Sequence, residues 1–198
     1  VCISGDGNYI VAGCEDHNVY FFSKQSSTPI WNYRTDGFFY SNHFGISMSD
    51  NGEYIAVGAG SPQPQGDKSV YLFHKSSNIP ILEYLTAYEV RSVSISGDGK
   101  YLVAGNTGGQ VYFFNKDSNT PIWSYDSHEG VPARPTHGTV VAISNNGNYA
   151  IAGTGNGKLL LFGPLMVPAL EPWWMQWWLW FSTTIGLGVT TTVLGLTT

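Results

Sequence analysis

Short runs of apolar residues recur along most of the chain, and Gly, Asn, Asp and Ser separate one run from the next. Residues 93–125 hold four such runs in a row. Runs of this length that are rich in Val, Ile, Tyr, Phe and Trp and bounded by turn-forming residues are typical of β-strands. The segment therefore predicts a unit of four short strands joined by tight turns.

The four-strand unit is repeated along the chain. The copies cover residues 1–33, 46–84, 93–125 and 141–162. Their first turns contain glycines that lie 45, 47 and 48 residues apart, namely Gly7, Gly52, Gly99 and Gly147. A period in this range is typical of β-propeller blades, which hold four strands each. We predict an all-β fold, a β-propeller with blades at residues 1–36, 45–87, 92–128 and 140–163.

The turns and strands of the unit each carry a signal. The first strand ends in Ser and leads into Asp-Gly or Asn-Gly, which favours a type I′ hairpin turn. If that turn has two residues, Cys2 lies opposite Val11 and Cys14 points to the other face, so the two thiols predict no disulfide. The third strand is apolar at every position, which predicts that both of its faces are covered. The fourth strand begins with Pro, as an outer edge strand can.

The repeats resemble those of the WD-repeat and pyrroloquinoline-quinone-like (PQQ-like) superfamilies over residues 1–162. The pattern Ser-x-Asp/Asn-Gly-x-Tyr is similar to the WD-repeat pattern, whereas Trp31 and Trp123 in the fourth strand are more like the PQQ-type repeat. The Gly-His and Trp-Asp dipeptides of WD repeats are absent. The PQQ resemblance would imply a quinoprotein dehydrogenase with a larger ring and a bound cation. Many of those enzymes also carry adjacent cysteines, which Cys2 and Cys14 are not.

The last copy stops after its third strand, because Gly163-Pro164 follows Phe162 in place of Pro-Ile-Trp. Propellers commonly complete the last blade with a strand from the N-terminus, but Val1 already lies in a first strand. We therefore interpret the chain as a fragment of a longer protein. The predicted structure is an incomplete ring with exposed blade edges.

The repeats differ mainly at one end of the predicted blades, where the second strand connects to the third and each blade connects to the next. Function tends to lie on variable loops that a rigid scaffold holds. We predict a binding face there; the alternative is that these loops only connect the blades. The candidate binding residues are Phe38, Tyr40, His43, Tyr88, Arg91, His128, Arg134 and His137.

Composition and charge narrow the classes of function. The net charge is −5 and no Lys/Arg cluster is present, so nucleic acid is not expected as a partner. The spacing of His43, His128, His137 and Glu129 matches no metal motif, and we predict neither a metal site nor a cofactor. The sequence has no nucleophile elbow and no P-loop, so we predict that the protein is not an enzyme.

The C-terminal segment differs from the repeats. Residues 164–172 form a Pro-rich linker, and residues 173–198, from Trp173 to Thr198, contain no charged side chain. About 20 apolar residues suffice for a transmembrane helix, and tryptophans crowd one end of this segment as in an interfacial belt. We predict a C-terminal transmembrane helix that contacts the membrane. The alternatives are a Thr-rich piece that packs on the propeller and a removable lipid-anchor signal.

These observations predict a non-catalytic, membrane-tethered β-propeller that serves as an interaction platform. Its ligand would be a protein, a peptide or a glycan. The variable face would point away from the membrane, and the propeller would be extracytoplasmic. Two alternatives stay open: a fragment of a PQQ-type quinoprotein dehydrogenase, and a structural component of a membrane or envelope assembly.

Overall fold

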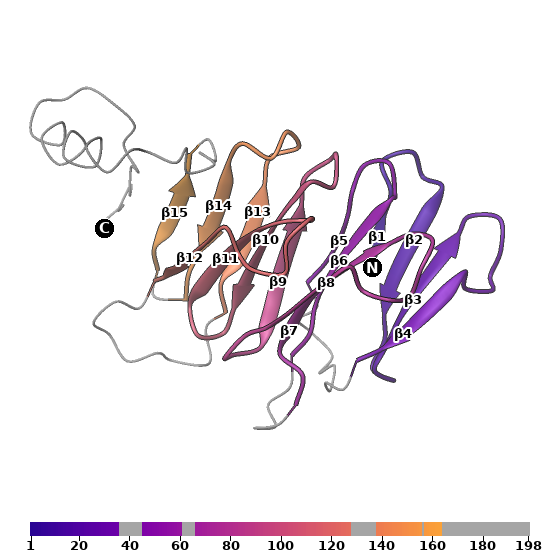
Figure 1. Cartoon of the computed structure of the whole chain (residues 1–198), viewed down its shortest axis with the longest axis horizontal. Coiled ribbons are helices and arrows are strands. Elements are labelled where there is room, and N and C mark those ends of the chain that lie inside the picture. The colour runs from indigo at the N-terminus through magenta and orange to yellow at the C-terminus, as the bar shows by residue number, and fades with distance from the viewer. Residues whose placement is uncertain (36–44, 61–65, 128–137, 156, 164–198) are drawn as a thin grey trace, which may run out of the picture.

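The computed structural model describes residues 1–35, 45–60, 66–127, 138–155 and 157–163. Within these residues all regular structure is β-strand, arranged in four separate antiparallel sheets that stand face to face in a row (Figure 1). We call the sheets blades 1 to 4. The fold is thus all-β and built from sheets of the kind found in β-propeller blades, as the sequence predicted.

Each blade is a meander in which neighbouring strands follow one another in the chain. Blade 1 contains β1 (Cys2–Ile3), β2 (Tyr9–Gly13), β3 (Asn18–Ser23) and β4 (Trp31–Arg34). Blade 2 contains β5 (Ile46–Met48), β6 (Tyr54–Gly58), β7 (Ser69–His74) and β8 (Leu82–Leu85). Blade 3 contains β9 (Val90–Ile95), β10 (Tyr101–Asn106), β11 (Gln110–Asn115) and β12 (Trp123–Asp126). Blade 4 contains β13 (Val140–Ile143), β14 (Ala150–Gly153) and β15 (Leu159–Phe162).

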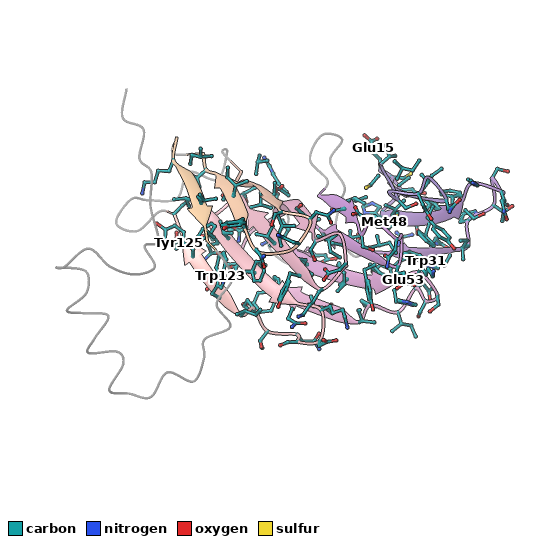
Figure 2. All side chains as sticks on the ribbon, turned by 90° about the horizontal axis from the view of Figure 1, so that it is seen from above. Glu15, Trp31, Met48, Glu53, Trp123 and Tyr125 are labelled. Carbon is teal, nitrogen blue, oxygen red and sulfur yellow. The ribbon has the colours of Figure 1, made fainter. Side chains whose placement is uncertain are left out.

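The hydrophobic core lies between the blades rather than inside any one of them. One cluster joins blades 1 and 2, one joins blades 2 and 3, and one joins blades 3 and 4. The third strands β7 and β11 are therefore buried on both faces, as their continuous apolar runs predicted. For β3 and β15 the prediction is wrong, because only one face of each is packed against another described blade. Aromatic side chains of the fourth strand extend each contact, as Trp31 does against Phe73 at 5.4 Å and Trp123 against Phe162 at 4.6 Å. Figure 2 shows Trp31 and Trp123 on their blades.

The turn between the first two strands is not the predicted type I′ turn. Gly7 has φ of +69°, but Asp6 does not share a positive φ, and the Gly7 amide donates to the carbonyl oxygen of Ser4 at 2.9 Å. The Ser4 hydroxyl donates to the Asp6 carboxylate at 2.6 Å and accepts from the Tyr9 amide at 3.0 Å. These side-chain bonds hold the turn in this form, which the dipeptide alone could not reveal. The hydrogen bond from Ser4 and those from Asn8 hold the pKa of Asp6 below its usual value.

The same turn recurs in the other three blades. The serine hydroxyl donates to the following Asn or Asp from Ser49 at 2.8 Å, from Ser96 at 2.6 Å and from Ser144 at 2.8 Å. The register that follows from this turn agrees with the prediction for blade 1, where Cys2 pairs with Val11. Cys2 and Cys14 are both free thiols. In each blade, the hydrogen bond between the serine hydroxyl and the Asp or Asn side chain two residues later therefore determines the form of the turn.

The turns also connect one blade to the next. The amide of Gly5 donates to the carbonyl oxygen of Asp50 at 2.8 Å, that of Asp50 to Gly97 at 3.0 Å, and that of Gly97 to Asn145 at 2.8 Å. In blades 1 to 3, the tyrosine at the start of the second strand packs on the turn glycine of the following blade. A Cβ added to Gly99, for example, would lie 2.3 Å from Cδ2 of Tyr54. These contacts give the blades a regular construction at the strand ends where the first strand connects to the second. We call this side of the molecule the turn end.

The fourth strands begin two residues later than predicted. Pro29, Pro80 and Pro121 precede β4, β8 and β12, and the isoleucine after each proline donates the first hydrogen bond to the third strand, at 2.7 to 2.8 Å. Proline has no amide hydrogen to donate, which explains why it stands just outside the strand.

Blades 1 and 4 lie at opposite ends of the row (Figure 1). The predicted linker and transmembrane segment, residues 164–172 and 173–198, lie outside the described residues, so both stay predictions. In the part of the chain that the structure describes, no helix has the length and hydropathy needed to cross a membrane.

Candidate interaction face

The opposite ends of the strands carry the loops between the second and third strands and the connections between blades. We call this side of the molecule the loop end. Two predicted binding residues, Tyr88 and Arg91, are described there. Tyr88 lies on the connection from β8 to β9, whereas Arg91 lies in β9 itself and not in the predicted loop. The other predicted binding residues lie outside the described residues and stay predictions, namely Phe38, Tyr40, His43, His128, Arg134 and His137.

The connection from β8 to β9 is held in place at its start by one threonine. The Thr86 amide donates to the Lys68 carbonyl oxygen at 3.1 Å. The Thr86 hydroxyl lies 2.7 Å from the same oxygen and 2.5 Å from the carbonyl oxygen of Tyr88. Thr86 itself is buried. The backbone that presents Tyr88 is therefore fixed to blade 2.

Tyr88 and Glu89 face glycines of the neighbouring loops. A Cβ added to Gly108 would lie 2.1 Å from Cδ2 of Tyr88, so the ring lies directly on the backbone of the β10–β11 loop. The Thr107 amide donates to the Glu89 carbonyl oxygen at 2.9 Å. Glu89 packs closely against Gly60, because a Cβ added to Gly60 would lie only 3.1 Å from the Glu89 Cβ. The connection thus spans the border between blades 2 and 3, while Tyr88 keeps 38% of its surface exposed.

Arg91 and Glu89 form an ion pair on this surface. Nη2 of Arg91 lies 2.9 Å from Oε2 of Glu89, and Nε lies 3.3 Å from the same oxygen. The side chains are 28% and 20% exposed, so solvent screens the pair less than it screens a fully exposed one. Across the blade border, a Cβ added to Gly138 would lie 3.2 Å from Cδ of Arg91. An aromatic ring thus stands beside a fixed charge pair, a combination suited to binding a peptide or a protein.

Buried polar side chains support the loop end from below. In blade 2, the Tyr71 hydroxyl donates to Asp67 at 2.8 Å, and Asp67 also accepts from the Ser69 amide at 2.9 Å. Burial, and next the charge of Asp67, raise the pKa of Tyr71 well above its usual value. The phenol therefore stays a neutral donor at physiological pH. This pair fixes the residues that lead into β7.

Blade 3 replaces the carboxylate with amides. Asn106 is fully buried, and its side-chain oxygen accepts from the amides of Gly108 and Gln110 at 3.1 and 2.9 Å. The Tyr112 hydroxyl donates to the Gln110 side chain at 2.7 Å. Burial is the main cause that raises the pKa of Tyr112 to about 12. The loop under Tyr88 is thereby rigid and uncharged.

Our candidate set did not include these supporting residues. A signal for them exists in the sequence: Asp16 and Tyr20 have the same spacing as Asp67 and Tyr71, and both pairs are bonded. In blade 3 the same tyrosine position contacts Gln110, two residues before it, so the spacing alone would not have found that partner.

Among the described residues no group of three or more His, Cys, Asp and Glu side chains could hold a metal ion. The histidines weighed as metal ligands, His43, His128 and His137, lie outside the described residues. What the described part of the face offers is surface for recognition: one exposed aromatic ring, one ion pair and rigid glycine-rich loops.

The comparison with protein families agrees with the architecture. The model of the WD domain, G-beta repeat matches residues 1–23 and 81–115. Together with the four-strand sheets, this match supports a WD-repeat, β-propeller-like protein. No curated protein matches the chain.

Proposed function

We propose that this protein is a non-catalytic interaction platform that binds a protein or peptide partner at its loop end and is tethered to a membrane by residues 173–198. The observation that carries the binding role is the WD-repeat match on four-strand blades. WD repeats typically mediate protein interactions and generally act as scaffolds rather than enzymes. Nothing in the described residues or in the family match supports the quinoprotein alternative.

The difference between the two ends supports placing the partner at the loop end. The turn end repeats one hydrogen-bonded turn in all four blades and uses it to connect the blades, so its backbone groups already serve the fold. The loop end differs from blade to blade and exposes Tyr88 beside the pair of Glu89 and Arg91. The tether would leave the loop end free, because β15 runs toward the turn end and the chain continues from there.

Selection of peptides on the full-length chain tests the binding role. A displayed library of random peptides should yield binders whose affinity falls at least about tenfold in Tyr88→Ala, because truncating an aromatic anchor removes a large part of the binding energy. The matched control is Ile79→Asp, an exposed residue at the turn end, which should leave the affinity unchanged. Failure to enrich any binder, or binders sensitive to Ile79→Asp and insensitive to Tyr88→Ala, would contradict this placement.

Vesicle flotation tests the tether. The full-length protein should float with phosphatidylcholine vesicles, and Leu187→Arg should float much less, because a charge at the centre of a membrane helix costs about 2.5–3.5 kcal/mol. Ile79→Asp again serves as the control for a change outside the segment. A wild-type chain that stays below the vesicles would rule out the tether while leaving the peptide selection unaffected.

A further inference from the structure

The two outermost blades expose complementary halves of the contact that joins the inner blades. In every inner contact, one blade contributes its forward face, which points toward higher residue numbers, and the next blade contributes its backward face. Val103, Val111 and Phe113 of blade 3 form such a forward face and are fully buried against blade 4. Their equivalents in blade 4 by strand register are Ile151, Leu159 and Leu161, which are 39%, 47% and 43% exposed.

The forward face of blade 4 is apolar throughout its described part. Val140 is 68% exposed and Ala142 is also exposed, in positions where blade 3 has Ser92 and Ser94. Those serines serve the blade contact, since they accept hydrogen bonds from the amides of Val141 and Ile143. An exposed sheet face this apolar is typical of a surface that a protein covers.

Blade 1 offers the opposite half. Tyr71 and Phe73 of blade 2 form the backward face that blade 1 covers, and both are buried. Their equivalents in blade 1, Tyr20 and Phe22, are only half-buried, and Ile3 on the same face is 59% exposed. One chain therefore carries a forward face and a backward face that no described residue covers.

At the turn end, blades 1 and 4 each have one half of a contact that joins the inner blades. Tyr9, Tyr54 and Tyr101 each pack on the turn glycine of the next blade, where an added Cβ would lie 2.3 to 2.7 Å from the ring. Tyr149 holds this position in blade 4 and is 48% exposed. Gly7 holds the glycine position in blade 1, and an added Cβ would meet nothing within 4 Å. Tyr149 in blade 4 therefore has no turn glycine of a described blade beneath it, and Gly7 in blade 1 has no tyrosine ring packed on it.

Two further kinds of contact between successive blades, one of lysine with tyrosine and one of backbone hydrogen bonds, also stop at blades 1 and 4. Lys75 lies over the ring of Tyr9 at 5.4 Å and Lys116 over Tyr54 at 5.6 Å, each from the blade after the tyrosine. Continuing the series would place Lys24 over Tyr149. The backbone bonds between turns run from Gly5 to Asn145, so the next bond would join the Asn145 amide to the Gly5 carbonyl oxygen.

We propose that a second copy of this chain covers these faces, with blade 4 of each copy packing on blade 1 of the other. The contact is head-to-tail, because the two faces are different surfaces of the chain. Head-to-tail contacts form a closed ring when the rotation between copies closes and an open series otherwise. The described blades of two copies number eight, which lies within the four to eight blades that propellers use. The pairing does not depend on the binding role proposed above.

The oligomeric state of the full-length protein in mild detergent tests the pairing. Sedimentation equilibrium should give the mass of two copies. Ile3→Asp and Leu161→Asp should each weaken the association at least about tenfold, because each buries a carboxylate in an apolar contact. Ile79→Asp is the control and should leave the mass unchanged. Both altered residues are partly exposed in the single chain, and circular dichroism should show that both variants keep the wild-type strand content.

Mixing the two variants distinguishes the head-to-tail contact from a contact between identical faces of the two copies. Ile3→Asp keeps an intact blade 4 and Leu161→Asp keeps an intact blade 1, so one undamaged contact can form only between unlike chains. Differently labelled variants should therefore form mixed pairs more readily than either variant pairs with itself. The two-copy ring is overturned by a wild-type monomer at all concentrations, as expected if residues 164–198 cover blade 4. An open series of larger species, or mixed pairs no stronger than like pairs, would overturn it as well.

Discussion

Replacing Phe113 with alanine should lower the free energy of unfolding by about 3–5 kcal/mol, the range for a fully buried aromatic side chain. Phe113 has no exposed surface and lies at the contact between blades 3 and 4. Its ring stacks on Trp123 at 5.3 Å with planes 9° apart, and on Tyr101 at 5.5 Å. The substitution removes the ring that these two aromatic side chains share, and β-strands on both sides limit how far the cavity can collapse.

Denaturant unfolding followed by tryptophan fluorescence measures this loss, since Trp123 contacts the altered position. The matched control is Phe113→Leu, because blade 2 has Leu72 at the equivalent position, also fully buried. We expect that variant to lose less than about 1.5 kcal/mol, as swaps that nearly conserve volume do. A loss below about 1 kcal/mol in Phe113→Ala would mean that blades 3 and 4 do not pack as described.

Gly105→Ala should destabilise the fold by about 1–3 kcal/mol, the usual cost of overpacking a filled site. A Cβ at Gly105 would lie 2.6 Å from the carbonyl oxygen of Thr139, a backbone atom at the start of blade 4. A flexible side chain could move away from an added methyl group, but this carbonyl group belongs to the backbone beside β13 and cannot easily do so. The clash would push blades 3 and 4 apart.

The repeat provides a closely matched control for this substitution. By strand register, Gly153 in blade 4 holds the position that Gly105 holds in blade 3, and a Cβ there would meet nothing within 4 Å. Gly153→Ala should be neutral, or stabilising by up to about 1 kcal/mol through a smaller entropy of the unfolded chain. Thermal unfolding of the two variants side by side checks the difference. Equal losses would show that blade 4 does not pack on blade 3 in the way Gly105 indicates.

The strands and the positions of the turns could be predicted from the sequence without the structure. Short apolar runs bounded by turn-forming residues predicted the strands. The glycines at Gly7, Gly52, Gly99 and Gly147 marked the turns, because a positive φ favours glycine whatever surrounds it. The pairing of Cys2 with Val11 followed from counting outward from such a turn. The type of turn did not follow, because it depends on a hydrogen bond from the serine hydroxyl to the Asp or Asn side chain, which the Asx-Gly dipeptide alone does not reveal.

The candidate site was predictable only as far as it is local. Tyr88 lies on the predicted connection between blades, whereas Arg91, three residues later, lies in β9 and not in that loop. Their contacts with Gly108 and Gly138 join residues 20 to 47 positions apart, and no spacing rule predicts them. The buried amide of Asn106 was missed for a related reason, because a polar residue next to Gly-rich sequence is typical of an exposed loop.

The sequence by itself determined the repeating unit, the strands and the position of each turn, because hydrophobic periodicity and backbone preference act over a few residues. Only the tertiary structure decided which face of each blade is covered. Leu161 and Phe113 hold equivalent positions in the repeat, yet one is 43% exposed and the other fully buried. Burial depends on whether another blade stands beside the strand, and that is a property of the row of blades, not of the unit.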